Sequence, residues 1–337
     1  MKYNLHLTHW IQPHLKESTL QVAKDNTYNK TIYFGQHEYE YGVDNFSKRL
    51  FKIANEKNVI LDVVTASTLK NHNLYRKKIN YHFWETFWIF SYAHILKGLQ
   101  SVQEHHEYKK LFINLNHRQH FHRCRIFDLI HKFNLEKIAH LSFPKNNESY
   151  VWRYIFNNGF VPYTTINDNF EETKNWQMPC IEYNESFIDL VSESISDPWL
   201  FLSEKTARPL LLGKPFLVVS TKGFHKFLES LGFVLYNEIF DYSFDIIDDE
   251  EERYNLLLQN IVKLIGTPIS EYDKIFKLIE NKIKYNQQLA YDYAFNQNRL
   301  PNIIKETFTN KSNVEILEYL NTITTTGYDI VESNSNV

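Results

Sequence analysis

The side chains best suited to ligand chemistry lie at the start of a helical segment, in the sequence Ser203-Glu204-Lys205. Helix N-termini favour anions, and the ammonium group of Lys205 adds a mobile positive charge for them. The carboxylate of Glu204 can accept hydrogen bonds from hydroxyl groups. A Gly-Lys-Pro break at 213–215 then leads into the apolar run 216–219, which is typical of a buried strand. This combination predicts a ligand that carries both phosphate groups and sugar hydroxyls.

A second polar cluster directly follows the β-type run 111–115. Asn116, Arg118 and Arg123 lie in it, and a helical pattern begins at its end. In open α/β sheets, loops that lead from the carboxyl end of a strand into a helix bind ligands. The two arginines either grip a diphosphate through forked hydrogen bonds or belong to a solvated basic loop. The histidines of this loop lack a partner carboxylate or cysteine at metal-ligand spacing, so no metal site is expected.

Two further loops follow apolar runs in the same half of the chain. Glu193 lies between two serines after the run 187–191, ten residues before the Ser-Glu-Lys sequence, and is expected to face the same crevice as Glu204. Thr221 lies between an apolar run and a helical pattern. Its loop is either an ordinary strand-to-helix connection or a contact with phosphate or ribose through backbone N–H groups.

A reaction at a hydroxyl group also needs a general base, for which a carboxylate is the usual choice. Glu38 and Glu40 alternate with tyrosines directly after the first predicted strand. They belong either to a loop that faces a ligand or to an ordinary solvent-exposed loop. Glu85 lies in a segment rich in Trp and Phe, either as a partnered buried carboxylate or as the base. These three glutamates are the catalytic candidates.

Alternation of strand-type and helix-type runs indicates an α/β fold, and a length of 337 residues favours two domains. Strands at 31–34 and 59–65 flank a helix at 45–56, which fits one βαβ unit and a parallel sheet. An aromatic helix at 83–99 and a polar linker at 101–110 follow. The pattern then restarts, with strands at 111–115, 138–143, 187–191 and 216–220, helices at 123–133, 152–160 and 224–231, and long helices over 253–321.

Composition narrows the class of partner. The formal net charge is -3, so no global basic field attracts nucleic acid. Two cysteines are too few for a disulfide framework. No charged leader followed by an apolar core begins the sequence, and the most apolar segment, 83–96, is too short to span a bilayer. A cytoplasmic protein without integral membrane contact is expected.

The order of these motifs resembles the donor half of GT-B glycosyltransferases. The nearest pattern is that of the α-1,3-fucosyltransferases, with exostosin-like enzymes and phage glycosyltransferase-like proteins close to it. That family has an Ala-Phe-Glu-Asn-Ser segment before a Val-Thr-Glu-Lys segment. Here the matching residues are Val191-Ser192-Glu193-Ser194 and Leu202-Ser203-Glu204-Lys205, and the family's Asn is absent.

The resemblance implies a GT-B-like fold, with two Rossmann-type domains facing a cleft. Its parts would be an acceptor domain at 1–105, a donor domain at 106–270, and C-terminal helices at 271–337 that pack back across the cleft. Glu204 would bind the ribose or donor sugar and Lys205 the diphosphate, while the other donor-side candidates are Asn116, Arg118, Arg123, Glu193, Ser203 and Thr221. Absence of an Asp-x-Asp motif at a strand end favours a metal-independent enzyme without a cofactor.

The function implied is inverting transfer of a hexose or pentose from a UDP- or GDP-linked sugar to a hydroxyl of a glycan. One alternative is a phage enzyme of the host cytoplasm that glycosylates hydroxymethylated bases in DNA. A second alternative is a non-catalytic binding protein with a GT-B fold.

Overall fold

The computed structural model describes residues 4–8, 31–35, 43–68, 77–98, 107–116, 120–142, 181–194, 200–307, 311–312, 314–316 and 318. The protein has a mixed α/β fold in which helices accompany two parallel sheets. The chain divides into two compact units. The first comprises Met1–Ile95, Trp199–Leu202 and Tyr291–Val337, and the second comprises Leu96–Pro198 and Ser203–Ala290.

The first unit contains a parallel sheet with the strand order β1-β2-β3-β5. Its strands are β1 (Asn4–Thr8), β2 (Thr31–Gly35), β3 (Leu61–Thr65) and β5 (Ile79–Phe83). Helix α2 (Val43–Glu56) connects β2 to β3, as the predicted βαβ unit requires. Its apolar stripe packs on one face of the sheet, where Leu50 and Ile53 form a cluster with Leu61, Val63 and Ile79. The predicted parallel pairing is therefore confirmed.

Helix α3 (Phe87–Gly98) is rich in buried aromatic residues. Phe87, Trp88 and Phe90 are all buried, so the helix is apolar around its whole circumference rather than on one stripe. The ring of His94 lies 4.5 Å from that of Phe90 and 4.9 Å from that of Phe295. The prediction of a buried aromatic helix is confirmed, but the helix begins at Phe87 rather than at residue 83, because Phe83 ends β5 and Glu85 lies in the turn between the two elements. Other elements among the described residues of this unit are the antiparallel pair β4 (Ser67–Thr68) and β9 (Leu200–Phe201), with η4 (Gln297–Arg299) and α11 (Asn302–Thr307).

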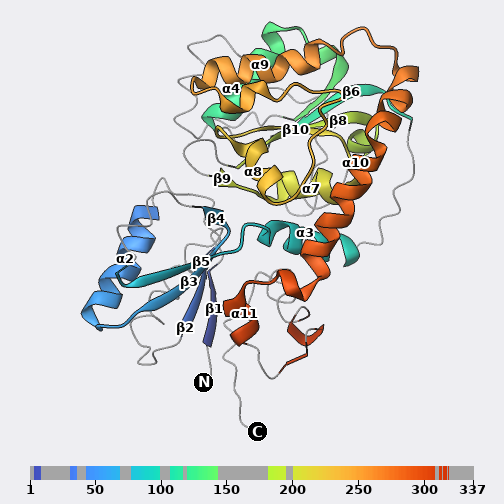
Figure 1. The fold of residues 1–337 in the computed structure, drawn as a ribbon. Coiled ribbons are helices and arrows are strands. Elements are labelled where there is room, and N and C mark those ends of the chain that lie inside the picture. Colours follow the sequence, from blue (N-terminus) through green and yellow to red (C-terminus); the bar gives the residue numbers. More distant parts are fainter. Residues whose placement is uncertain are drawn as a thin grey trace. The chain divides into compact units, whose positions relative to one another are not determined.

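The second unit contains a parallel sheet with the strand order β10-β8-β6-β7 (Figure 1). Its strands are β6 (Lys110–Leu115), β7 (Ala139–Ser142), β8 (Ser186–Ser192) and β10 (Phe216–Val219). Every residue of β8 is buried, as expected for a strand that has neighbours on both sides and helices on both faces. All four strands were predicted from the sequence to within a few residues.

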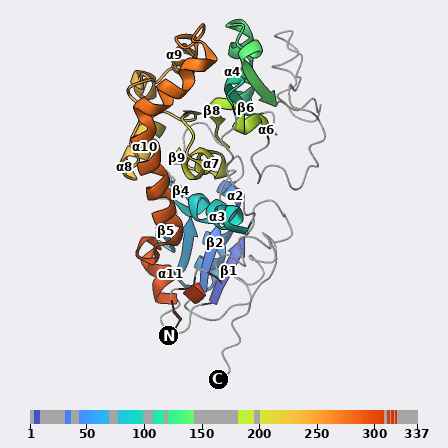
Figure 2. The same ribbon diagram turned by 90° about the vertical axis from the view of Figure 1, so that its right-hand side faces the viewer.

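Helices cover both faces of this second sheet (Figures 1 and 2). Helices α4 (Phe121–Lys132) and α9 (Glu250–Val262) lie on one face, and α7 (Glu204–Leu212) and α8 (Phe224–Ser230) lie on the other. Helix α10 (Ile269–Phe295) joins α7, because the side-chain amide of Gln287 donates to the carbonyl oxygen of Leu211 over 2.8 Å. Shorter elements are η2 (Glu136–Ile138), α6 (Ile181–Asn184) and η3 (Ser243–Ile246).

Helix α7 is fixed at both ends and along its body. Ser203 is its N-cap, with the hydroxyl oxygen accepting from the N–H of Lys205, and Gly213 ends it in the left-handed conformation at φ +68°. Along the body, Arg208 forms a forked ion pair with Asp189 of β8, the shortest N–O distance being 2.8 Å. Asp189 is fully buried, so this pair fixes the position of α7 relative to the inner strand β8.

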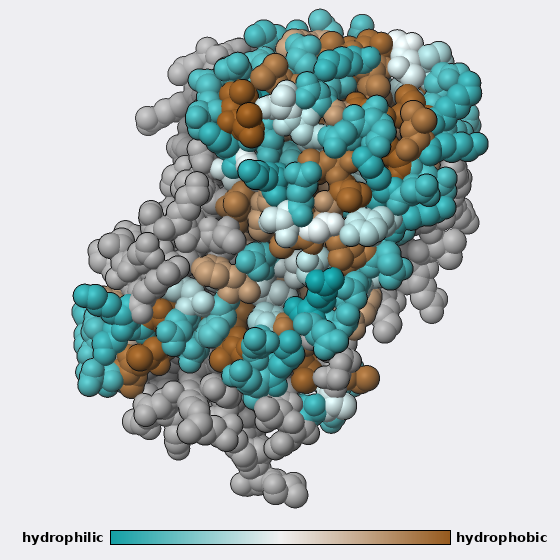
Figure 3. Space-filling view, viewed as in Figure 1, coloured by the Kyte–Doolittle hydropathy of each residue, from teal (hydrophilic) through white to brown (hydrophobic). Residues whose placement is uncertain are grey.

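On the face of the protein in Figure 3, hydrophobic residues lie in small areas among hydrophilic ones. In the part of the chain that the structure describes, no helix is both long and apolar enough to cross a membrane. Within the same residues, no group of three or more His, Cys, Asp or Glu side chains is positioned to hold a metal ion.

Candidate functional site

The order of the strands in the second sheet reverses between β6 and β8. From β6 the chain continues through α4 to β7 on one side, whereas β8 lies on the other side of β6 and leads through α7 to β10. Right-handed connections then place α4 and α7 on opposite faces, and their N-termini diverge at the carboxyl edge. Open α/β sheets bind ligands at such a reversal. The strand order therefore marks the loops after β6 and β8 as the candidate site.

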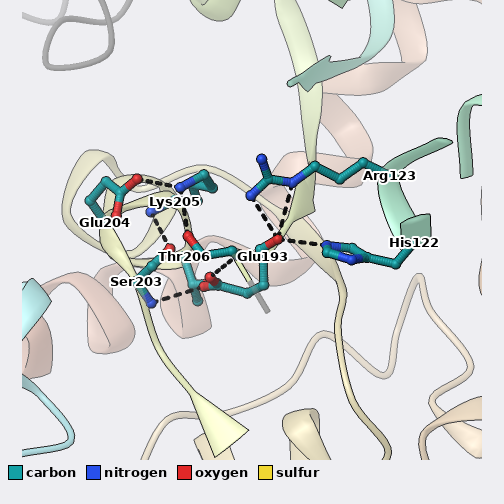
Figure 4. Close-up of polar contacts among 8 residues, drawn as sticks. His122, Arg123, Glu193, Ser203, Glu204, Lys205 and Thr206 are labelled. Atoms are coloured by element: carbon teal, nitrogen blue, oxygen red, sulfur yellow. Dashed lines mark hydrogen bonds and ion pairs between the residues drawn. The ribbon is translucent and has the colours of Figure 1, made fainter. Parts of the chain in front are cut away.

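Glu193 follows β8 directly and is fully buried at this point (Figure 4). One carboxylate oxygen accepts from the N–H of Ser203 over 3.1 Å and from the hydroxyl of Thr206 over 2.5 Å. The other accepts from the N–H of Ser194 over 2.9 Å. Both carboxylate oxygens are therefore engaged by the protein itself, and they fasten the first turn of α7 to the end of β8.

The backbone carbonyl of Glu193 binds the first turn of α4 (Figure 4). It accepts from His122 Nε2 over 2.8 Å, and from Arg123 Nε and Nη2 over 3.2 and 2.9 Å. His122 and Arg123 belong to the first turn of α4 and are almost fully buried. A single residue thus joins the N-termini of two helices that lie on opposite faces of the sheet. The sequence analysis expected the guanidinium group of Arg123 to grip a diphosphate with two nitrogens. In the structure, Nε and Nη2 of this group donate to the Glu193 carbonyl instead.

The electrostatics of this junction fix the charge of His122. Burial, followed by the charge of Arg123, lowers the pKa of His122 from 6.5 to about 3, although the hydrogen bond to the carbonyl of Glu193 opposes the shift. The ring is therefore neutral near pH 7. Because its Nε2 faces a carbonyl oxygen, the proton of the neutral ring lies on Nε2.

We expect His122 to make the protein sensitive to mild acid. Between pH 6.5 and 3 the unfolded chain binds a proton at this histidine that the folded chain does not, so stability falls as the pH is lowered through this window. In His122→Gln the amide can still donate to Glu193 but does not titrate. Urea unfolding at a series of pH values should show a slope smaller by about one proton, or about 1.4 kcal/mol per pH unit.

The matched control for this experiment is His131→Gln, because His131 lies on the same helix with a partly exposed side chain. This variant controls for the exchange of a histidine for glutamine on the same helix. Equal slopes in His122→Gln and the unaltered protein would contradict the expected neutral, buried state of His122.

Glu204 and Lys205 lie in the first turn of α7 and pair with each other (Figure 4). Lys205 Nζ donates to Glu204 Oε1 and, over 2.8 Å, to the hydroxyl oxygen of Ser194. Their side chains are 19% and 15% exposed for Lys205 and Glu204 respectively. Burial alone would raise the pKa of Glu204, but the charge and hydrogen bond of Lys205 outweigh it and lower that pKa below its ordinary value. The Glu204 carboxylate is therefore ionised at neutral pH.

Two buried amide side chains are hydrogen-bonded in series where β6 and β8 end side by side. Asn114 Nδ2 donates to the carbonyl oxygen of Leu190 and to the hydroxyl of Ser192, and Asn116 Nδ2 donates to Asn114 Oδ1 over 2.5 Å. Asn116 is 2% exposed, and its Oδ1 has no hydrogen-bond donor among the described residues. Buried polar atoms are normally paired, so this edge of the sheet carries more hydrogen-bonding capacity than the fold alone uses.

The other predicted site residues are not in this cluster. Thr221 is buried in the loop between β10 and α8, and Glu85 lies in the turn before α3 in the first unit. Glu38, Glu40 and Arg118 lie outside the described residues. The structure thus brings together Arg123, Glu193, Ser203, Glu204 and Lys205, with Asn116 at the end of the neighbouring strand.

A second histidine–carboxylate pair, His225 and Asp245, lies at the start of α8. His225 Nδ1 is 2.9 Å from Asp245 Oδ1, while its Nε2 accepts from the N–H of Val218. Asp245 also accepts from the N–H groups of His225 and Lys226. Burial alone would raise the pKa of Asp245, but the hydrogen bonds that its carboxylate accepts outweigh burial and lower it. Asp245 therefore caps the first turn of α8. Because both ring nitrogens of His225 are hydrogen-bonded within the protein, this histidine is no candidate base.

Sequence reasoning missed two residues of the site, Thr206 and Asn114. It also missed that His122 donates a hydrogen bond to a backbone carbonyl. Thr206 had a local signal, because it lies three residues after the helix cap, where a side chain faces back towards the helix start. Asn114 also had one, since a polar residue inside an apolar strand needs a buried partner.

Comparisons with family models, with curated proteins and with solved structures find no significant match to this chain. The resemblance to glycosyltransferases therefore rests on the short motifs around Glu193 and Glu204.

Proposed function

We propose that the second unit binds a nucleotide diphosphate sugar at the carboxyl edge of its sheet, and that the protein is a glycosyltransferase with a GT-B-like pair of domains. The observation that supports this most is the position of the Glu204–Lys205 pair. It lies at the N-terminus of α7, beside the reversal of strand order between β6 and β8. A cation, a helix N-terminus and a carboxylate at one edge match a ligand with a diphosphate and hydroxyl groups.

The proposed chemistry is inverting transfer without a metal. The acceptor hydroxyl attacks the anomeric carbon of the sugar, its proton passes to a carboxylate base, and the bond to the diphosphate breaks. The ammonium of Lys205 and the N-terminus of α7 stabilise the negative charge that develops on the leaving diphosphate. Glu204 accepts from the hydroxyls of the ribose or the sugar. The candidate bases remain Glu38, Glu40 and Glu85.

Arg123 has a supporting part in this proposal. Because its Nε and Nη2 are bound to the carbonyl of Glu193, it contributes positive charge near the diphosphate rather than a forked grip. For the acceptor, the formal net charge of -3 favours a glycan over DNA with hydroxymethylated bases.

Nucleotide binding tests the proposal directly. We expect at least one of UDP, GDP, CMP and the UDP- and GDP-sugars to raise the Tm of the protein. A ligand at 100 times its Kd should stabilise the folded state by about 2.7 kcal/mol. Thermal unfolding with each compound, and with uridine and guanosine as phosphate-free controls, measures this. If no nucleotide shifts the Tm, the donor site and the enzyme assignment both fail.

A further inference from the structure

The two charged groups of the proposed donor site neutralise each other in this structure. Within the described part of the chain, Lys205 is the only side chain that donates to Glu204, and it does so at Oε1. Glu204 Oε2 is inaccessible to solvent and has no donor among the described residues. Among the described residues, the carboxylate therefore depends on Lys205 for side-chain hydrogen bonding and for most of its charge compensation, to which Arg123 adds a smaller part.

This dependence has unequal consequences for different ligands. An anion that takes over Lys205 leaves a largely buried carboxylate without its partner and places a second negative charge beside it, and both effects oppose binding. A ligand that brings hydroxyl groups next to its anionic group avoids this penalty, because those hydroxyls donate to the oxygens of Glu204 as Lys205 turns to the phosphate. Ser194 keeps the ammonium in place during the exchange, since its hydroxyl oxygen accepts from Lys205 Nζ over 2.8 Å.

We propose that the Glu204–Lys205 pair is a specificity device, which rejects ligands that are only anionic and admits those that carry hydroxyl donors beside a diphosphate. This inference rests on the proposed function, and it adds that free phosphate and pyrophosphate are poor competitors for the nucleotide. Glu204 has two roles in it, as an acceptor for hydroxyls and as a repulsive group towards bare anions.

Calorimetric titration of UDP, GDP and inorganic pyrophosphate into the full-length protein tests this inference. In Glu204→Gln the Kd of the nucleotide should rise about tenfold or more, because a hydrogen bond to a charged acceptor is lost. The Kd of pyrophosphate should fall about two- to fivefold, because Lys205 no longer has a competing carboxylate. Glu204→Asp keeps the negative charge and should still bind pyrophosphate weakly.

Glu251→Gln is the matched control. Glu251 is also a glutamate in the first turn of a helix of the second unit, paired with Arg125, and its replacement should leave the ratio of the two Kd values unchanged. If the folded Glu204→Gln variant binds pyrophosphate no better than the unaltered protein, the specificity role is wrong while nucleotide binding stands. If the unaltered protein binds neither UDP nor GDP, the proposed function fails together with this inference.

Discussion

Glu193→Gln should lower the free energy of unfolding by about 3 kcal/mol. The carboxylate accepts from three donors, the N–H groups of Ser194 and Ser203 and the hydroxyl of Thr206. An amide has only one acceptor oxygen, so its NH2 group must face at least one backbone N–H at close range. That N–H is buried and loses its partner, which costs more than the hydrogen bond itself. Urea unfolding at pH 7 measures the difference.

The control for Glu193→Gln is the same substitution at Glu238, whose carboxylate pairs with Lys282 in a largely exposed position. It should change stability by less than about 1 kcal/mol. Thr206→Val and Thr206→Ser separate the hydroxyl from the shape of the side chain, and only the valine variant should weaken the junction. A Glu193→Gln protein as stable as the control would mean that the carboxylate does not hold the first turn of α7.

Glu193→Gln should also weaken nucleotide binding, although the Glu193 carboxylate is fully buried and bound to the protein itself. Its carboxylate positions α7, which carries Glu204 and Lys205, and its carbonyl positions the first turn of α4. Because Glu193 acts only by positioning other residues, its substitution should raise the Kd for nucleotide in proportion to the displacement of Glu204 and Lys205. As a single change, Thr206→Ser keeps the hydroxyl and should retain the Kd of the unaltered protein, whereas Thr206→Val should raise it.

Local signals predicted much of the second unit. The cap at Ser203, the helix end at Gly213 and the buried run of β10 each depend on a few neighbouring residues, and all three are confirmed. Gly232 also ends α8 in the left-handed region, at φ +91°, as predicted. In the first unit the sequence did not reveal β1 or β5. Both are short runs that alternate apolar and polar residues, so neither has the continuous apolar stretch that identified the other strands.

The arrangement of the site could be predicted only in part. That Glu193 and Glu204 would lie at one edge followed from their positions after a buried strand and at a helix start. That the protein itself would occupy Glu193 did not follow from the sequence. Its carbonyl oxygen accepts from His122 and Arg123, some seventy residues away in the chain. Its carboxylate accepts from Ser203 and Thr206, which only the folding of α7 onto the end of β8 brings close. A carboxylate in a loop has the same local sequence signal whether it faces a ligand or closes a junction, and only the packing of distant helices decides between the two.

Lys205→Met should reduce glycosyl transfer by about 100-fold or more, the largest functional effect that we expect. The thioether side chain is close to lysine in length and carries no charge, so the leaving diphosphate loses its nearest cation. Nucleotide affinity should also fall by about tenfold or more, because a charge-assisted hydrogen bond to phosphate is lost. Release of UDP or GDP from the corresponding nucleotide sugar, measured with each variant at saturating donor, tests the prediction.

Stability must be distinguished from function in this variant, since Glu204 loses its partner when Lys205 is replaced. Lys205→Arg keeps a cation next to Glu204 and should preserve the Tm, with only part of the loss in transfer, because the guanidinium is larger and forked. Lys222→Met is the matched control. Lys222 lies in the loop after β10 and pairs with Asp248, whose carboxylate is exposed, so its loss should leave both transfer and stability nearly unchanged. If Lys205→Met transfers sugar as fast as Lys222→Met, Lys205 does not belong to the donor site. The assignment of the N-terminus of α7 to that site would then also be wrong.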